Sequence, residues 1–541
     1  MDKKIHPLIL YGVPLLLAAI LKYFVIPVGI TPFNADEAIV ALMARHINQG
    51  QLPTFFYGQY YMGSLDAMLI AVFFRILDEQ VWVIRVVQSL LYLGTVATTV
   101  KLATKIFKTD RAAFYAGLMV ALPAVNVTLY STVSLGGYGE MLLIGNLLLL
   151  GGMGVIDQLK VNETTNKKIY FGLITWGFRA GFAFWVVGLT LVYSLPIIIC
   201  LLWLLIKKNR DILLPGLVCL GIGGILGSSP WWATALIAGN LDVITELAGG
   251  AISGVSEGSR LIQPLRRLGS LVVFGGSAAT GMRPPWSVQW LMLPLLPLIL
   301  VFWMAVLYDS FQKLIRDKLK SYLSLFALMG LVLAAGFILS PYGDDPSGRY
   351  FLPLVIPMSL FAANTITTKI GGKKYWEYVL VGFLLIFNMG GMIQALGPNS
   401  PGLTTQFDTV AQVDHSRMEE LIGFLQKNDI TAGYSNYWVS YPLAFLTQEE
   451  IIFVPRLPYH EDFRYTARDD RYYPYTEMVE SSSEIAYITT HHVGLNKYLE
   501  DQFKIKGISW QKETIGDYTV YYQLSSPVRV EEIGLGETTR P

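Results

Sequence analysis

The sequence predicts a polytopic α-helical membrane protein that carries a C-terminal α/β domain outside the cytoplasm. Three observations lead to this fold class: the apolar composition, about eleven apolar runs of membrane length, and a change of pattern after about residue 400. Of the 541 residues, 53% are hydrophobic and only 15% are charged, whereas a soluble protein has about 25% charged residues. The expected surroundings are therefore a lipid bilayer. The net charge of +1 gives no reason to expect a nucleic acid partner.

About 20 apolar residues cross a bilayer as a helix. The first run lies in MDKKIHPLILYGVPLLLAAILKYFVI, which starts like a signal peptide. Its apolar stretch is too long for one, and no small-residue cleavage site follows, so we expect a retained span. The segment SLDAMLIAVFFRIL at 64–77 has only fourteen residues, which favours a helix lying in the interface. The expected spans are 7–27, 82–105, 112–130, 137–156, 169–186, 188–206, 212–229, 290–308, 322–340, 350–368 and 376–396.

The basic residues of the short loops place the N-terminus in the cytoplasm, because cytoplasmic loops are enriched in Lys and Arg. With this orientation every basic cluster falls on the inner side, and Arg349 is the exception in the short outer loops. An odd number of spans then places the C-terminal region outside, together with the loops 31–81 and 230–289. The inner clusters are Lys3 and Lys4, then KLATKIFKTDR, DQLKVNETTNKK, KKNRD, DSFQKLIRDKLK and TKIGGKK.

Helix-like and strand-like patterns alternate after residue 400, which predicts a small α/β domain. No run in this part has membrane length. We therefore divide the chain into a membrane domain of residues 1–400 and an α/β domain of residues 401–541. Helices are expected at RMEELIGFLQKND and LNKYLEDQFK, and strands at ITAGYSN, EEIIFVPR, SEIAYITT and YTVYYQL.

Several familiar motifs are absent from the sequence. It has no Gly-rich loop followed by Lys-Ser/Thr, no HExxH and no CxxC, so neither a nucleotide-binding loop nor a known metal motif is expected. Cys200 and Cys219 both lie in apolar runs, which argues against a disulfide framework. The histidines do not have the spacing of metal ligands.

An acidic pair, Asp36 and Glu37, follows the first span in TPFNADEAIVALMARHI. Adjacent carboxylates repel each other and are costly to desolvate, so the pair needs an explanation. One interpretation is an interfacial helix capped by Asn34 or Asp36, because the helix dipole favours acidic residues in a first turn. The other interpretation is a functional site. The spacing alone leaves both open.

Two further outer segments place ionisable residues at the edge of a span. Glu140 follows a glycine-rich turn in YSTVSLGGYGEMLLIG, and Asp344, Asp345 and Arg349 lie in SPYGDDPSGRYFLPL. Ionisable residues at such positions are functional candidates. A solvated helix N-terminus would also account for Glu140. Arg349 could either extend to the lipid headgroups or form a fork on a phosphate.

The outer loop 230–289 begins with PWW and contains SRLIQPLRRLGSLVVFGG. Trp231 and Trp232 are expected in the aromatic belt at the membrane surface. Arg260, Arg266 and Arg267 fit an amphipathic helix that binds anionic headgroups. Anchoring of a phosphate is the alternative role for these arginines.

The order of these segments resembles the polyprenyl-phosphate-dependent glycosyltransferases of the GT-C superfamily. A first span, the DEA motif and an interfacial helix ending in FFRILDEQVWVIRVVQSLL are similar to the family 39 type, which includes protein O-mannosyltransferases and lipid A aminoarabinose transferases. The stretches YGQYYMGSLDAML, GGYGE, ILGSSPWW and GRYFLPLVIP resemble bacterial members, and NYWVSYPLAFLTQEEIIFVP resembles the outer α/β domain that some of them carry. The resemblance covers nearly the whole chain. Each motif is short, and the specificity comes from their order and spacing.

This resemblance implies a GT-C-like fold and transfer of a sugar from a polyprenyl-phosphate donor to a protein, lipid or glycan acceptor at the outer face. Asp36 matches the acid of the first outer loop, which acts as a general base or a metal ligand, and Glu140 matches a second acid. The second loop has no Asp-x-Asp, a departure from the family pattern. The expected site comprises Asp36, Glu37 and Glu140 in catalysis, Arg349, Arg266 and Arg267 at the donor phosphate, Tyr57, Tyr61, Tyr138, Asp344 and Asp345 at the substrates, and Asp36 with Glu140 at any divalent metal.

The chemistry of these residue types agrees with such a reaction. A carboxylate within hydrogen-bond reach of an acceptor hydroxyl takes its proton, and an Arg fork stabilises a leaving phosphate. One carboxylate acting directly predicts a single displacement with inversion. We assign Asp36 to this chemistry, and Glu37 to positioning or to a pair with Arg45 one turn along the helix.

Two other classes of protein compete with this interpretation. A transporter or lipid-carrier flippase favours internal repeats and ionisable residues near the bilayer midplane, whereas this sequence has no visible repeat and its candidate acids lie at the outer edges. An envelope scaffold or lipid-binding receptor would leave Asp36, Glu140 and Arg349 unconnected in space.

Overall fold

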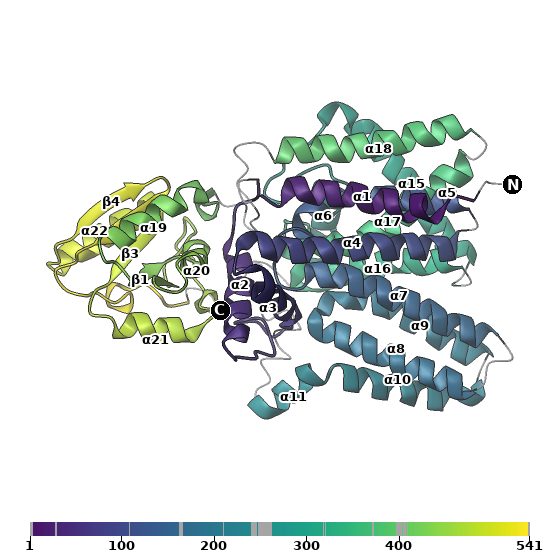
Figure 1. Ribbon diagram of the computed structural model, residues 1–541, viewed down its shortest axis with the longest axis horizontal. Helices are drawn as coiled ribbons and strands as arrows, with labels where there is room; N and C mark the ends of the chain where they lie inside the picture. Colours follow the sequence, from purple (N-terminus) through teal and green to yellow (C-terminus); the bar gives the residue numbers. More distant parts are fainter. Residues whose placement is uncertain are drawn as a thin grey trace.

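The protein consists of a helical bundle with an α/β domain attached to one end (Figure 1). The computed structural model describes residues 4–27, 30–107, 109–161, 166–208, 210–239, 246, 262–317, 319, 321–370, 373–396, 403, 407 and 409–538. We call the end of the bundle that carries the α/β domain the outer end. The N-terminus lies at the opposite end (Figure 1).

Within the described residues, nine helices are long and apolar enough to cross a membrane, and a bent pair raises the number to ten. The bent pair consists of α10 and α11, whose axes differ by 63° at a short break. This arrangement confirms the polytopic helical fold that the hydropathy predicts. The helices are α1 (Pro7–Val25), α4 (Val81–Ile106), α7 (Tyr138–Lys160), α8 (Asn166–Val186), α9 (Leu191–Lys208), α10 (Leu213–Gly227), α11 (Ser229–Ala238), α15 (Leu296–Asp317), α16 (Tyr322–Leu339), α17 (Val355–Lys369) and α18 (Lys374–Ala395).

The predicted span at 112–130 is not one helix. The chain forms α5 (Asp110–Ala121) and α6 (Val125–Tyr130), with Pro123 between them. Proline lacks the amide hydrogen that a helix needs and disfavours helical geometry in the residue before it, so the helix ends there. The flanking helices α4 and α7 run in the same direction, since Lys105 pairs with Asp157 at 2.8 Å near their C-terminal ends. The α5–α6 segment must therefore return the chain across the bundle.

Two helices of the first outer loop lie between the bundle and the α/β domain (Figure 1). These are α2 (Ala35–Asn48) and α3 (Leu65–Leu77). The thirteen-residue α3 is too short to span a bilayer and agrees with the predicted interfacial helix. In the second outer loop the described part forms α13 (Gln263–Ser270), a π-helical turn η4 (Leu271–Gly276) and α14 (Ser277–Ala279).

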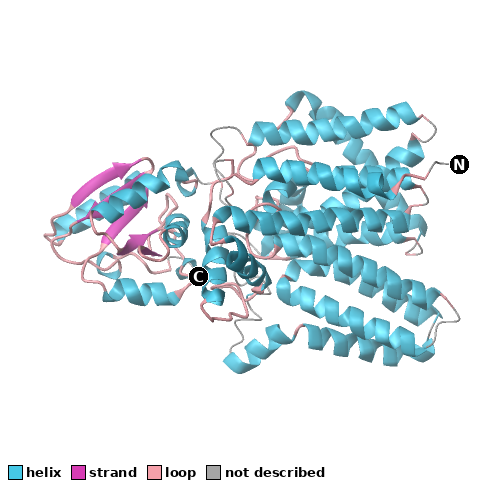
Figure 2. Cartoon of the chain, in the orientation of Figure 1, coloured by secondary structure: helices cyan, strands magenta, loops and turns pink. Residues whose placement is uncertain are grey.

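The α/β domain contains the strands (Figure 2). Its sheet has the order β2-β1-β3-β5-β4, in which β1 pairs in parallel with β2 and β3 while β5 pairs antiparallel with β3 and β4. The six predicted elements are confirmed, and the proposed boundary at residue 400 lies outside the described residues. The elements are α19 (Met418–Lys427), β1 (Ala432–Ser435), α20 (Tyr437–Leu446), β2 (Ile452–Pro455), α21 (Tyr473–Ser481), β3 (Ala486–Thr490), α22 (Val493–Ile505), β4 (Gln511–Ile515) and β5 (Tyr518–Tyr522).

A polar cluster joins the α/β domain to α2. Glu449, after α20, accepts from the His46 Nε2 at 2.9 Å and from the Tyr475 hydroxyl at 2.7 Å. Arg45 lies 3.5 Å from the same carboxylate and bonds through its Nε to Glu79 at 2.6 Å. The C-terminal half of α2 is therefore fixed to the α/β domain by a charged network, which is the contact that sets the position of its N-terminal half.

We expect Glu449→Gln to weaken this contact by about 1–3 kcal/mol, because hydrogen bonds to a charged group are lost. Burial raises the pKa of Glu449, but the bonds from His46 and Tyr475 and the charge of Arg45 outweigh it and lower the pKa to about 2. A depressed carboxyl pKa stabilises the folded state above its ordinary value of 4.5, and this stabilisation is lost as the pH falls toward 2.

The measurement is the unfolding temperature in detergent at pH 7 and pH 3. Glu449→Gln should lower it at pH 7 and by less at pH 3, while the adjacent exposed Glu450→Gln should have little effect at either pH. An equal loss in both variants, or a loss independent of pH, would contradict the role given to Glu449.

Candidate active site

Asp36 lies in the first turn of α2 and is partly exposed at the junction of the two domains. Asn34 caps this helix, because its side-chain oxygen accepts from the Glu37 amide at 3.0 Å. The Tyr437 hydroxyl, at the start of α20, donates to the Asp36 Oδ1. The capped-helix interpretation is thus correct, and the cap also presents one of the two acids to a surface formed by both domains.

Glu37 points away from that surface and is fully buried. Its two carboxylate oxygens accept from the Arg85 Nε at 3.1 Å and Nη2 at 2.9 Å. Arg85, on α4, also donates to the Ile26 carbonyl oxygen at 3.1 Å. The proposed pair of Glu37 with Arg45 is wrong, since Arg45 contacts Glu79 and Glu449 instead. Glu37 fixes α2 against α4, so it positions its neighbour Asp36.

Arg349 lies at the outer end of the bundle, at the start of η7 (Arg349–Leu354). Its guanidinium pairs with Asp345 at 2.7 Å and lies 5.1 Å from the centre of the Tyr350 ring. The Nε is buried without a hydrogen-bond partner among the described residues. The phenol groups of Tyr130 and Tyr138 lie within its electrostatic range. Arg349 therefore has one donor that a further acceptor could use.

A second buried arginine holds the turn that carries Arg349. The Arg283 guanidinium donates to the Phe274 carbonyl oxygen at 2.7 Å and to the Pro346 carbonyl oxygen. Burial lowers its pKa to about 10, and its bonds go to neutral oxygens of the backbone and of Ser277. The turn before η7 is thus fixed to the second outer loop.

Tyr61 connects the two halves of the site. Its ring lies 6.2 Å from the Tyr342 ring, which lies 5.2 Å from the ring of Tyr350 beside Arg349. With the Gln59 amide oriented to match donors with acceptors, its oxygen accepts from both Nη atoms of Arg471 at 2.8 Å, and its nitrogen donates to the Tyr61 hydroxyl at 3.0 Å. Arg471 in turn packs against the Tyr437 ring, whose hydroxyl bonds to Asp36. A series of side-chain contacts therefore links Arg349 to Asp36 through Tyr61.

Glu140 belongs to a neighbouring buried cluster. Its carboxyl group lies beside that of Asp66 on α3, which also accepts from the Gln88 amide at 2.7 Å and the Ser134 hydroxyl. Burial raises the pKa of Asp66. Two adjacent buried carboxyls avoid repulsion by sharing one proton. Glu140 therefore contacts Asp66, whereas Asp36 contacts Tyr437.

These contacts bear on the predicted metal site at Asp36 and Glu140. Across the described ranges no group of three or more His, Cys, Asp or Glu side chains could hold a metal ion. Asp36 accepts from Tyr437 and Glu140 lies beside Asp66, so the two acids have separate partners. The metal site at Asp36 and Glu140 stays a prediction.

The remaining predicted residues divide between this site and other contacts. Arg267 is buried and pairs with Asp344 at 2.9 Å, whereas Arg266 is exposed. Arg260 lies outside the described residues. Tyr57 stacks on Tyr472 at 4.8 Å between ring centres and bonds to the His46 Nδ1 at 2.9 Å. Tyr57 thus lies in the polar cluster that joins the domains.

Sequence reasoning missed the residues that the α/β domain contributes. Tyr437 and Arg471 are 401 and 435 positions from Asp36. Arg468 is held by Glu246 of the second outer loop at 3.0 Å. One feature of the sequence could have indicated these arginines, because TARDDRYYPY places several charged residues next to one another in the α/β domain. Asp66 also carried a signal, as the single acid in SLDAMLIAVFFRIL.

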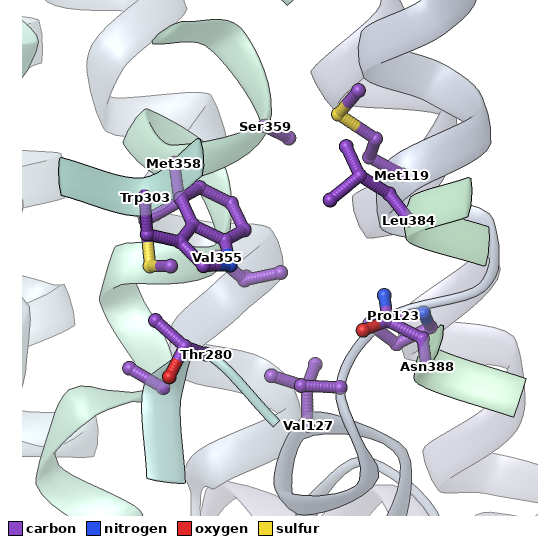
Figure 3. Close-up of a pocket in the computed structure, with 12 residues that line it drawn as sticks. Met119, Pro123, Val127, Thr280, Trp303, Val355, Met358, Ser359, Leu384 and Asn388 are labelled. Carbon is purple, nitrogen blue, oxygen red and sulfur yellow. The ribbon is translucent and has the colours of Figure 1, made fainter. Parts of the chain in front are cut away.

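An apolar pocket lies within the bundle, with side chains from α5, α15, α17 and α18 around it (Figure 3). Val355, which lines it, follows Arg349 by six residues. The intervening residues form the 3₁₀ helix η7, which rises about 2 Å per residue. Val355 therefore lies roughly 12 Å from Arg349 along the helix axis. Its walls are formed by Met119, Pro123, Ala124, Val127, Ala279, Thr280, Trp303, Val355, Met358, Ser359, Leu384 and Asn388.

Comparison with known proteins gives no match among family models or curated sequences. Solved structures do match. ArnT from Cupriavidus metallidurans bound to undecaprenyl phosphate has a TM-score of 0.59 at 10% identity, over 94% of this chain and 97% of that one. The archaeal oligosaccharyltransferase AglB from Archaeoglobus fulgidus, in complex with an inhibitory peptide and a dolichol-phosphate, has a TM-score of 0.52 at 11% identity, over 94% and 74%. A second structure of the Archaeoglobus fulgidus oligosaccharyltransferase, in complex with Zn and sulfate, also has a TM-score of 0.52. The chain therefore has the polytopic fold of ArnT and AglB.

Proposed function

We propose that this protein is a membrane glycosyltransferase that moves a sugar from a polyprenyl-phosphate donor to an acceptor at the outer end of the bundle. The observation that carries the proposal is the series of side-chain contacts that links Asp36 to Arg349 through Tyr61, within a fold similar to that of ArnT. A partly exposed carboxylate and a guanidinium with an unused donor are the two groups that such a transfer needs.

Asp36 acts as the general base in this proposal. One of its oxygens accepts from Tyr437, which leaves the other to take the proton from an acceptor hydroxyl as the new glycosidic bond forms. Because the carboxylate does not attack the sugar itself, the reaction is a single displacement that inverts the anomeric configuration. Glu37 and Arg85 hold the helix on which this base lies.

Arg349 stabilises the phosphate that leaves the sugar. A guanidinium forms charge-assisted bonds to phosphate oxygens, and these strengthen as the leaving group gains charge. We assign the first isoprene units of the carrier to the apolar pocket that begins six residues after Arg349, because Val355, Met358 and Trp303 line it. The neighbouring structures contain undecaprenyl phosphate and dolichol-phosphate, which supports a lipid-phosphate carrier here.

We place the outer end outside the cytoplasm. The inner loops hold the Lys- and Arg-rich clusters, and the positive-inside rule assigns that side to the cytoplasm. A cysteine-accessibility assay on intact cells tests this, with a Cys placed in the α/β domain expected to react with an impermeant reagent.

The test of function uses the purified full chain in detergent and a panel of radiolabelled polyprenyl-phosphate sugars. We expect slow release of free sugar from one donor even without an acceptor, because water replaces the hydroxyl nucleophile. Unlabelled polyprenyl phosphate, the product, should inhibit this release. Release from no donor, combined with donor movement across liposomes, would contradict the enzyme and support a flippase.

A further inference from the structure

The contact between Tyr437 and Asp36 joins residues that are 401 positions apart. Tyr437 opens α20, whose N-terminus is capped by Asn436 through a 3.0 Å bond from the Trp438 amide. The Asn436 amide also donates to the Thr490 hydroxyl at 2.8 Å, which ties this end of α20 to β3. The Tyr437 ring is therefore held in place by the sheet before it reaches Asp36.

Arg471 packs behind Tyr437 and links it to the first outer loop. Its guanidinium lies 5.6 Å from the centre of the Tyr437 ring and donates to the Gly58 carbonyl oxygen at 3.2 Å. Gly58 has a φ of +66°, and a Cβ there would lie 2.8 Å from the Arg471 Cδ. Only glycine fits that position without displacing the arginine. The α/β domain and the loop around Gly58 therefore enclose Tyr437 from two sides.

We infer that Tyr437 is a positioning residue for Asp36, so that the α/β domain completes the active site of the membrane domain. This inference rests on the proposed function. A hydroxyl donated to Oδ1 fixes the orientation of the carboxylate and directs Oδ2 toward the acceptor. In the described part of the chain no donor to the Asp36 Oδ2 is found.

Several other groups face Asp36 and act on its charge. Tyr61 comes from the first outer loop, while Tyr459, Asp469 and Arg471 come from the α/β domain. Burial raises the pKa of Asp469 to about 7 against the opposing charge of Arg471. Tyr437 differs from these four groups because it donates a hydrogen bond to the carboxylate. Removal of its hydroxyl leaves the four groups in place.

The test is Tyr437→Phe, which keeps the ring and removes the hydroxyl. We expect kcat at neutral pH to fall about tenfold while KM for the donor stays unchanged, because the hydroxyl orients the base and does not contact the donor. The matched control is Tyr487→Phe, whose buried hydroxyl donates to the Val528 carbonyl oxygen at 2.7 Å inside the α/β domain. It should leave both kcat and KM unchanged. KM does not depend on the fraction of folded enzyme, and kcat is expressed per folded enzyme measured by gel filtration.

A double variant separates positioning from general damage. In an Asp36→Asn background, Tyr437→Phe should lower the residual rate no further, because both changes act through one carboxylate. A tenfold loss in that background, or a Tyr437→Phe enzyme with a wild-type kcat, would overturn the inference and leave the proposed function standing. A wild type that neither transfers nor hydrolyses any donor would overturn both.

Discussion

Asp36→Asn is expected to reduce sugar transfer by roughly 10²–10⁴-fold, the range for loss of a general base. Asparagine has nearly the same shape, and its side-chain oxygen can still accept the hydrogen bond from Tyr437. The N-terminal cap at Asn34 is also unchanged, so folding should persist. What is lost is the basic oxygen that takes the proton from the acceptor hydroxyl.

The measurement is turnover of the donor by purified Asp36→Asn beside the wild type, with the unfolding temperature as a check on folding. Asp78→Asn is a matched control, because this exposed acid follows the last residue of α3 and the substitution removes one carboxylate without changing the size of the side chain. The control should transfer sugar at the wild-type rate. Near-normal turnover by a folded Asp36→Asn protein would remove Asp36 from the chemistry.

Much of the membrane domain was predictable because a bilayer imposes a single strong requirement on each span. Backbone groups in the hydrocarbon must be paired within the segment, so length and apolarity alone identify a helix. The prediction was wrong in detail at 112–130, where apolarity is uniform but Pro123 breaks the helix. A hydropathy scale scores Pro123 by its polarity and takes no account of the amide hydrogen that proline lacks.

In the α/β domain the same reasoning found the buried strands and missed one at the edge. The strands β1, β2, β3 and β5 are almost wholly buried, so their apolar runs were visible. The strand β4, QKETI, exposes four of its five side chains and has the composition of a polar loop. Its pairing with β5 comes from backbone bonds, which leave no apolar pattern in the sequence.

The candidate site shows a different limit. Asp36 and Arg349 stand out in the sequence because each is ionisable and lies at the end of a span. Their partners do not, since Tyr437 and Arg471 belong to a domain whose tyrosines mostly pack with one another. Only the docking of the α/β domain, through Glu449 and His46, brings them to Asp36. Patterns in one amino-acid sequence describe residues that are neighbours along the chain, whereas this site depends on a contact between two domains.

Arg349→Lys is expected to lower kcat/KM for the donor by about 10²-fold, the lower end of the range for loss of one transition-state donor. Lysine keeps the positive charge and can still pair with Asp345, so the turn should remain folded. It lacks the planar fork, and with it the Nε that is buried without a partner among the described residues. A point charge binds phosphate but does not reproduce two parallel bonds to its oxygens.

The discriminating measurement is inhibition by polyprenyl phosphate, which is the leaving group itself. Arg349→Lys should weaken this inhibition together with kcat/KM, because both depend on the same phosphate contact. Arg417→Lys provides the control, since this arginine of the α/β domain is exposed and pairs with Glu420 at 2.8 Å. It should change neither quantity. If Arg349→Lys lowered kcat/KM while inhibition by polyprenyl phosphate stayed at the wild-type level, Arg349 would act through the Asp345 turn instead of through the carrier phosphate.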